Sequence, residues 1–362
     1  MDFKQLALEL TETVKKYRHL LIYIKGSPDP DAIAASFVLK LICEHFGTKA
    51  TINSPVYPSL PQNIKIIKDL HLPIHFETPK DKNHYDAYAV LDHQSIAVDG
   101  VTGVIPCAIQ IDHHELMDDN IPIDLKIVVE EAGSTSTIMT FIMKELGSEL
   151  NFKKGSRIKI ATALYYGIQT DTDDFQHASP LDKKALKIIS LEYNGQLIHG
   201  LSSLPYSREF MDFFNLALQN QITYKDWLIS GIGYIDEKYR DTVSIIGDFL
   251  LKREDISTAV VFSIVEKKKG LILNVSFRTK KKNFNLNTLI KRITSEGGAR
   301  KFKGAYQVNL DYFGYCTDRD LLWKVVYTTT VDVLKKQRDA RGMQYFKNYL
   351  RRAKGKLVDI FR

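Results

Sequence analysis

Short apolar runs alternate with helical patterns through the first half of the chain. Almost continuous apolar runs, bounded by polar turns, indicate strands that are buried on both faces. Such strands, separated by helices, predict a parallel sheet that is covered on both faces. The predicted strands are HLLIYIK (19–25), KATIN (49–53), YDAYAVLD (85–92), CAIQID (107–112) and DLKIVVE (124–130), and the predicted helices lie near 31–46, 61–70, 134–147 and 156–169.

A second pattern begins near Tyr224, with GIGYI, TAVVFSIVE and LILNVSFR as strand candidates and NLNTLIKRIT as a helix. A chain of 362 residues also favours two domains, since one domain usually takes ~100–200 residues. We therefore expect an α/β protein with two lobes facing each other across a cleft. The expected parts are a larger domain (1–195), a connector (196–223), a smaller α/β domain (224–330) and a helical tail (331–362).

Composition places the chain among ordinary globular proteins, with 44% hydrophobic and 26% charged residues. The three cysteines are scattered, which favours a reducing, cytoplasmic location over a disulfide framework or a zinc ribbon. We find no apolar run long enough to span a membrane, and acidic residues interrupt the N-terminal apolar pattern. A signal peptide and membrane association are therefore not expected.

Positive charge gathers at the C-terminus. The net charge is +7, and ten Lys or Arg residues against two Asp lie between Lys335 and Arg362. Basic charge at a terminus suits a polyanion such as RNA. A solvated helix face, docked on the body through its aromatic residues, explains the same pattern.

Acidic residues and histidines follow the ends of several predicted strands. Because parallel strands end at one edge of a sheet, these side chains should converge there. Clustered carboxylates repel one another unless a cation lies between them. Aspartate oxygens with a few histidine nitrogens suit Mn²⁺ or Mg²⁺ better than zinc. The residues are Asp29, Asp31, Asp92, His113, His114 and, at the end of a helical run, Asp171.

These motifs resemble the DHH phosphoesterases over roughly residues 15 to 330. The resemblance is closest to the bacterial enzymes that degrade very short RNA (nanoRNase) and dephosphorylate 3′-phosphoadenosine 5′-phosphate. It implies a Rossmann-like DHH domain followed by a DHHA1-type substrate-binding domain. The motifs are PDPDA (28–32), LDHQS (91–95), IDHHE (111–115), GSTST (133–137) and YGIQTDTDDF (166–175), with VSFR (275–278) and EGGARKFKGAYQV (296–308) in the second domain.

The resemblance further implies a centre with two metal ions and a metal-activated water as nucleophile. Asp29 and Asp92 would hold the first ion. His114 would face the scissile phosphate, and Asp112 would support the histidine pair. The ligands of the second ion would be Asp31, Asp92, His113 and Asp171.

One departure from the family pattern affects the first ion, because Lys25 stands where the family has a histidine ligand. A protonated lysine cannot ligate a metal and repels it. Three outcomes stay open: two ions with water in the missing place, one ion with Lys25 supplying the other charge, or an inactive descendant.

Smaller features complete the expected site. Ser134 or Thr135 should cap a helix whose exposed N–H groups can hold an anion. Asp173 takes a place where the family often has glycine. The expected substrate-binding residues are Arg278, Gly297, Gly298, Arg300, Lys301 and Lys303.

We thus expect an enzyme that hydrolyses short oligoribonucleotides with Mn²⁺ or Mg²⁺, with 3′-phosphoadenosine 5′-phosphate as a second candidate substrate. One alternative is a phosphodiesterase for linear or cyclic dinucleotides. Another is a catalytically impaired nucleotide- or RNA-binding protein, because of Lys25. Short RNA or a nucleotide would be the partner, and a homodimer is an option.

Overall fold

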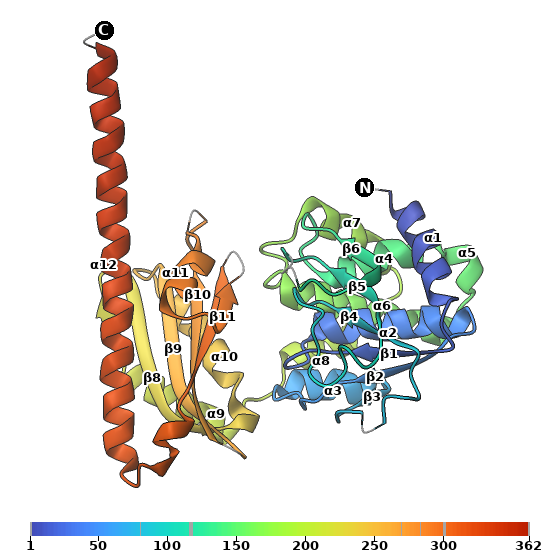
Figure 1. The fold of residues 1–362 in the computed structure, drawn as a ribbon, viewed down its shortest axis with the longest axis horizontal. Helices are drawn as coiled ribbons and strands as arrows, with labels where there is room; N and C mark the ends of the chain where they lie inside the picture. Colours follow the sequence, from blue (N-terminus) through green and yellow to red (C-terminus); the bar gives the residue numbers. More distant parts are fainter. Residues whose placement is uncertain are drawn as a thin grey trace. The chain divides into compact units, whose positions relative to one another are not determined.

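The computed structural model describes residues 2–79, 81–115, 119–268, 270–282, 284–299 and 302–360, without the side chains of 148 and 341–360. The chain divides into two compact units, Met1–Leu204 and Pro205–Arg362 (Figure 1). The described part contains no helix that is both long and apolar enough to cross a membrane.

The first unit is built on a six-stranded sheet in which every neighbouring pair is parallel, in the order β3-β2-β1-β4-β5-β6. The predicted α/β class with a parallel sheet is confirmed. The strands are β1 (His19–Tyr23), β2 (Lys49–Asn53), β3 (Ile74–His75), β4 (Ala87–Leu91), β5 (Cys107–Asp112) and β6 (Ile123–Val128).

The helices of this unit pack in one core against one face of the sheet, and residues 96–105 cover the other face, which explains why β4 and β5 are buried along their whole length. The helices are α1 (Phe3–Val14), α2 (Pro30–His45), α3 (Pro61–Asp69), α4 (Thr135–Glu145), α5 (Gly147–Leu150), α6 (Lys154–Asp171), α7 (Pro180–Ile189) and α8 (Gly195–Ser202).

The direction of strand succession reverses between β1 and β4, because β2 and β3 lie on one side of β1 and β4 to β6 on the other. In open parallel sheets, ligands bind beyond the carboxyl ends of the strands at such a reversal point. The loops that follow β1, β4 and β5 therefore form the edge where a ligand is expected to bind.

Local capping explains how two helices begin at this edge. Asp29 precedes Pro30 and accepts a hydrogen bond from the Ala32 N–H at 2.9 Å, which starts α2. Ser134 accepts one from the Thr137 N–H at 3.1 Å and starts α4. The predicted cap at Ser134 is thus confirmed.

The second unit contains another six-stranded sheet, in the order β11-β12-β10-β9-β8-β7, in which only β8 and β9 pair in parallel. Its elements are α9 (Arg208–Gln219), β7 (Ile222–Tyr224), β8 (Trp227–Asp236), η1 (Glu237–Tyr239), α10 (Thr242–Leu251), β9 (Thr258–Lys267), β10 (Gly270–Thr279), α11 (Leu286–Ile293), β11 (Gly297–Ala299), β12 (Lys303–Asn309), η2 (Asp311–Tyr315) and α12 (Arg319–Ile360).

Alternation along β8 separates two cores in this unit. Leu228 packs in the core that contains α9 and α10, whereas Trp227 and Ile229 pack in the core that contains α11 and α12. Because successive side chains of a strand point to opposite faces, each pair of helices covers one face of the sheet.

The predicted connector and the described start of the predicted tail belong to packed elements. α8 lies in the first unit and α9 in the second, so the division falls within the expected connector 196–223. α12 begins at Arg319, and Val331 and Leu334 within the expected tail are buried. The functional assignment of the domains and the cleft between them stay predictions.

Candidate metal centre

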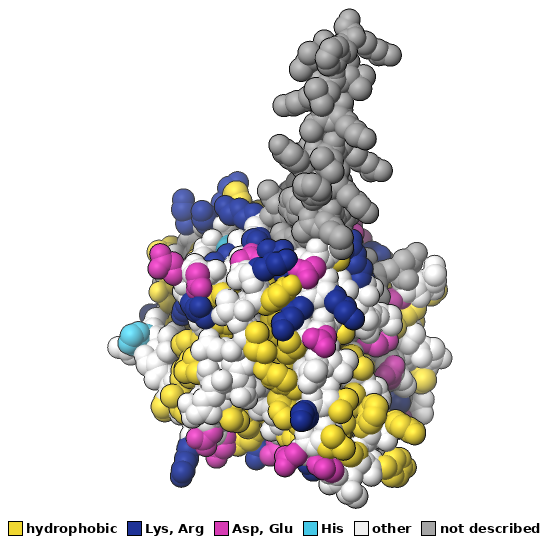
Figure 2. Space-filling view, turned by 90° about the vertical axis from the view of Figure 1, so that its left-hand side faces the viewer, with side chains coloured by type: hydrophobic (Ala, Val, Ile, Leu, Met, Phe, Trp, Pro, Cys, Tyr) yellow, Lys and Arg dark blue, Asp and Glu magenta, His cyan; other side chains and the backbone are white. Residues whose placement is uncertain are grey.

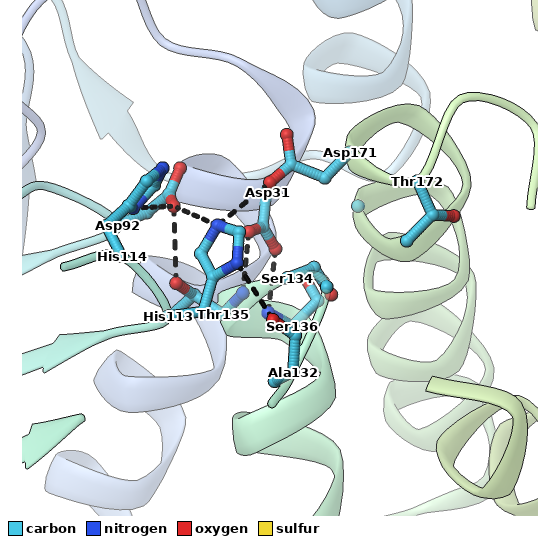
Figure 3. Close-up of polar contacts among 12 residues, drawn as sticks. Asp31, Asp92, His113, His114, Ala132, Ser134, Thr135, Ser136, Asp171 and Thr172 are labelled. Carbon is cyan, nitrogen blue, oxygen red and sulfur yellow. Dashed lines mark hydrogen bonds and ion pairs between the residues drawn. The ribbon is translucent and has the colours of Figure 1, made fainter. Parts of the chain in front are cut away.

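Carboxylates and imidazoles from four places in the first unit meet at the carboxyl edge of the sheet (Figure 3). Asp31 comes from the first turn of α2, Asp92 and His113 directly follow β4 and β5, and Asp171 ends α6. One ligand atom from each lies within 4.8 Å of the others. The structure therefore brings together the four residues expected for the second ion.

Asp31 belongs to α2, but its fully buried carboxylate contacts the N-terminus of α4. Its Oδ2 accepts the Thr135 N–H and its Oδ1 accepts the Ser136 N–H, each at 2.7 Å. The anion expected at this helix N-terminus is thus the carboxylate of Asp31 itself. Burial, with the charges of Asp92 and Asp171, raises the pKa of Asp31 well above its usual value.

His113 presents a buried nitrogen to two carboxylates. Its Nδ1 lies 3.2 Å from the Ala132 carbonyl, and a carbonyl only accepts, so Nδ1 carries a proton. Nε2 lies 3.1 Å from Asp171 Oδ2 and 3.4 Å from Asp92 Oδ1, in hydrogen-bond geometry with neither. A neutral ring would turn a lone pair towards two negative groups, so a proton or a cation must lie between them.

The pKa of His113 also reflects the two negative groups that face its ring. Burial alone would lower this pKa, but Asp171 and Asp92 outweigh burial and raise it well above its ordinary value. The side chain is only 8% exposed, so water screens these charges little.

Asp112 holds the second histidine. Its Oδ1 accepts the backbone N–H groups of His113 and His114 at 2.8 and 3.2 Å, and the Nδ1 of His114 at 2.5 Å. Burial would raise the pKa of Asp112, but the hydrogen bond from His114 outweighs it and the pKa is lowered. An ionised Asp112 therefore keeps a proton on Nδ1 of His114 and sets the orientation of the ring.

Sequence reasoning missed Asp182, which positions the GSTST loop. This buried carboxylate accepts the Gly133 N–H at 2.9 Å, the Thr137 hydroxyl at 2.7 Å and the Ser179 N–H at 2.7 Å. A Cβ on Gly133 would lie 2.3 Å from Asp182 Oδ2, so glycine is required there. The SPLD sequence at 179–182 is a capping box and was the available signal, although it predicts only a helix start.

Close packing and backbone strain place Asp171. A Cβ on Gly167 would lie 2.3 Å from Ser136 Oγ, so glycine lets α6 approach α4 and α2. After Asp171, three consecutive residues have positive φ angles: Asp173 (52°), Asp174 (52°) and Phe175 (67°). Left-handed backbone at Asp173 explains why glycine suits that place, and strain of this kind is common beside functional sites.

The region that contains Asp31, Asp92 and His113 matches a known family, and Asp171 follows three residues after it. Residues 19–168, from β1 into α6, match the model described as "DHH family, N-terminal domain". Residues 19–168 are a DHH-family domain. The family prediction is confirmed for these residues, whereas the DHHA1-type domain and the nanoRNase branch stay predictions.

Similar proteins extend the likeness beyond the DHH domain. The uncharacterized protein MJ1633 of Methanocaldococcus jannaschii is 32% identical over 321 residues, which are 88% of this chain and 64% of that protein. The chain thus spans 64% of the length of this relative.

Solved structures support the fold of both units. An exopolyphosphatase-related protein from Bacteroides fragilis superposes with a TM-score of 0.68 at 18% identity, over 92% of this chain and 95% of that one. A pGpG-specific phosphodiesterase from Vibrio cholerae covers 86% of this chain and 98% of its own at 12% identity, but its TM-score of 0.29 is too low to carry an argument.

The DHH domain uses the two residues predicted around the first ion in other ways. Lys25 donates to the Ser95 carbonyl at 3.1 Å, to the Ser95 hydroxyl at 3.2 Å and to the Ala97 carbonyl. Burial lowers the pKa of Lys25. Asp29 caps α2 and belongs to neither of the groups of clustered ligand atoms in the described residues.

The expected substrate-binding residues lie in the second unit, outside the DHH domain. Arg278 on β10 is 11% exposed and is bound by Asp248 Oδ1 at 2.7 Å and Ser276 Oγ at 3.0 Å. Gly297 lets β11 approach β12, since its Cβ would lie 2.5 Å from that of Tyr306. Gly298 lies in β11 and Lys303 begins β12, while Arg300 and Lys301 fall outside the described residues.

Proposed function

We propose that this chain is a metal-dependent phosphoesterase whose metal ligands are the four-residue cluster of the first unit, of which Asp31, Asp92 and His113 lie in the DHH domain and Asp171 directly after it. The observation that carries the proposal is the buried Nε2 of His113, which faces Asp92 and Asp171 without a hydrogen bond to either. A divalent cation would satisfy all three groups at once.

The donor set also fits the ion. Three aspartates and one imidazole favour Mn²⁺ or Mg²⁺, and the absence of a thiolate speaks against structural zinc. A bound divalent ion would act as a Lewis acid and lower the pKa of a bound water for attack on phosphorus. The hydrogen bonds from α4 to Asp31 and from His113 to Ala132 hold two of the ligands in place beforehand.

His114 and Asp112 have the second proposed role. With the proton of Nδ1 committed to Asp112, the other ring nitrogen of His114 is the group that would contact the scissile phosphate. Asp112 holds the ring in this orientation, and a hydrogen bond donated by the ring to the phosphate would stabilise negative charge that develops on phosphoryl oxygens.

The proposed substrates are short 5′-phosphorylated oligoribonucleotides, with 3′-phosphoadenosine 5′-phosphate as a second candidate. Support comes from the family resemblance and from the basic residues Lys303, Arg300 and Lys301 around the glycines of the second unit. Arg278 supports the proposal less, because its ion pair with Asp248 neutralises part of its charge. A cytoplasmic location and a homodimer stay predictions.

The test is hydrolysis of a 5′-phosphorylated RNA dinucleotide with Mn²⁺ by the full chain. We expect turnover that both His113→Ala and Asp171→Ala abolish. Asp173→Ala is the matched control, because it removes a carboxylate from the same turn that lies outside the ligand cluster. Retained turnover in His113→Ala would contradict the assigned centre.

A substrate panel separates the alternatives. It contains pApA, cyclic di-AMP, oligomers from dimer to pentamer, 3′-phosphoadenosine 5′-phosphate and long single strands. Preference for long strands would reject the proposed substrate class, and preference for cyclic di-AMP would favour the dinucleotide alternative. Tight binding without turnover, with turnover on Lys25→His, would favour the impaired binding protein.

The basic end of α12 is proposed to add RNA affinity. On the face in Figure 2, Lys and Arg side chains lie among Asp and Glu side chains, whereas the sequence after Ala340 is strongly basic. Truncation after Ala340 keeps Arg338 and Asp339, which anchor α12 to the second unit. We expect weaker RNA binding with a flatter salt dependence, because fewer phosphate contacts release fewer counterions. If the truncated chain and the full chain bind RNA equally well, both at low and at high salt, this role is rejected.

A further inference from the structure

The first unit offers a set of four ligands for one metal ion. At the place expected for another ion, Lys25 binds a neighbouring loop instead. Asp31, Asp92, His113 and Asp171 converge within 4.8 Å. In the other clustered group of the described residues, His114 Nδ1 donates to Asp112 Oδ1 at 2.5 Å, so these two atoms are used within the group. A protonated nitrogen in a hydrogen bond has no lone pair for a metal, which leaves Nε2 of His114 and the unbonded Oδ2 of Asp112 as the ligand atoms of these two residues.

Lys25 is committed to the loop that follows Asp92. An ammonium group has three N–H donors, and three oxygens surround this one: the carbonyl and hydroxyl of Ser95 and the carbonyl of Ala97. The nearby acidic groups that attract the ammonium are Asp119 and Asp99, which both lie outside the ligand cluster. Lys25 therefore ties the end of β1 to this loop.

The same loop is held from its other side. Asp119 Oδ2 accepts the Ile96 N–H at 2.6 Å and the Ala97 N–H at 3.3 Å. His93, the imidazole next to Asp92, turns its Nδ1 to the backbone of Ser95 at about 3 Å and belongs to no ligand group among the described residues. Neither an imidazole nor a carboxylate of this loop is thus offered to a second ion.

We infer that this chain holds a single divalent ion, and that Lys25 replaces the second ion as a positioning residue for the 93–97 loop. The inference rests on the proposed function, which requires a metal. Of the three outcomes given for Lys25, it selects one ion with the lysine supplying the other positive charge. A dication beside Lys25 would meet a fixed positive charge that already has all its hydrogen bonds.

Metal stoichiometry tests the inference without an activity assay. Chelator-treated full chain is titrated with Mn²⁺ in a calorimeter, and bound manganese is measured by elemental analysis after dialysis. We expect one equivalent per chain, lost in His113→Ala. Two tightly bound equivalents would overturn the single-ion inference and leave the proposed function intact. No bound ion would overturn the metal-dependent function itself.

Lys25→Met tests the role of the lysine, because methionine keeps the length of the side chain and removes the ammonium. We expect one Mn²⁺ equivalent with an affinity changed by less than ~10-fold, as for a residue that does not touch the ion. Amide hydrogen exchange in 95–98 should rise at least ~10-fold, since the loop loses its anchor. Lys126→Met, an exposed lysine of β6, is the control. Unchanged exchange, or loss of the bound ion, would overturn the assigned role.

Discussion

Two aspartates in the two units face opposite electrostatic surroundings. Asp31 of the DHH domain is fully buried beside Asp92 and Asp171, and its pKa is raised well above the usual range. Asp226 in the second unit, which precedes β8, is also partly buried, but Lys281 and Arg338 contact its two oxygens. Burial would raise its pKa, yet the hydrogen bonds from Lys281, Ser257 and Arg338 lower it.

The difference distinguishes a structural anchor from the proposed metal site. The chain itself supplies the cations for Asp226, and Arg338 thereby fixes α12 to the start of β8, with Arg338 Nε 2.6 Å from Asp226 Oδ1. In the four-residue cluster found among the described residues, His113 stands among three carboxylates, and His114 Nδ1 lies 3.8 Å from one oxygen of Asp92. Carboxylates kept together at such a cost in stability indicate a cation from outside the chain.

The largest expected effect comes from Asp171→Asn. It removes one charge and one ligand, so hydrolysis should fall at least ~100-fold. Mn²⁺ at 100 times the wild-type Kd should stabilise the wild type by about 2.7 kcal/mol and the variant much less. Urea unfolding with and without Mn²⁺ measures this difference. Asp173→Asn is the charge-matched control. An equal loss in both variants would mean that the net negative charge of this turn, and not ligation by Asp171, causes the effect.

Gly167→Ala tests whether helix packing holds the DHH site together. The added methyl group would lie 2.3 Å from Ser136 Oγ, so the variant should lose about 2 kcal/mol of stability and bind Mn²⁺ more weakly. Urea unfolding and Mn²⁺ titration measure the two effects.

Gly155→Ala in the same helix is the control, since no atom lies within 4 Å of the added methyl group. Alanine should stabilise that position by up to about 1 kcal/mol. Equal behaviour of the two variants would show that close approach of α6 does not constrain the site.

Arg338→Met should weaken the ion-pair cluster of Asp226, Lys281 and Arg338 without changing the DHH domain. Asp226 keeps Lys281 but loses a charged hydrogen bond, so the second unit should lose about 1–2 kcal/mol. Hydrogen exchange at the start of β8 measures the loss. Lys336→Met removes the same charge from an exposed position of α12 and should change stability by less than about 0.5 kcal/mol. Faster amide hydrogen exchange around the proposed metal ligands would contradict the expectation that this variant affects the second unit alone.

The smallest expected effects are in the pH dependence of the chelated protein, and they differ in sign. A raised folded-state pKa makes stability fall as pH rises, for Asp31 above ~3.9 and for His113 above ~6.5. The lowered pKa of Asp226 contributes stability above ~3.9 that is lost only as pH falls further.

Urea unfolding followed by hydrogen exchange in each unit checks these signs. Between pH 6 and 8 the chelated DHH domain should lose stability, and the region around Asp226 should not change. Saturating Mn²⁺ should remove the loss in the DHH domain. A loss that persists with Mn²⁺ would mean that groups other than the ligands cause it.

Local patterns in the sequence determined a large part of this protein. Apolar runs predicted the strands of the first sheet except the two-residue β3, and the parallel arrangement placed Asp31, Asp92 and His113 at one edge. These features depend on neighbours in the sequence and on the general geometry of parallel sheets.

Only the tertiary structure decided how charges are paired. Lys25 reaches the 95–97 loop, Asp182 holds Gly133, Asp248 binds Arg278 and Arg338 binds Asp226, all between residues far apart in the chain. No periodic pattern encodes such pairs, because they depend on how helices and loops pack. The physical reason is that a charged group takes its role from the groups within a few ångströms of it, and folding alone selects those groups.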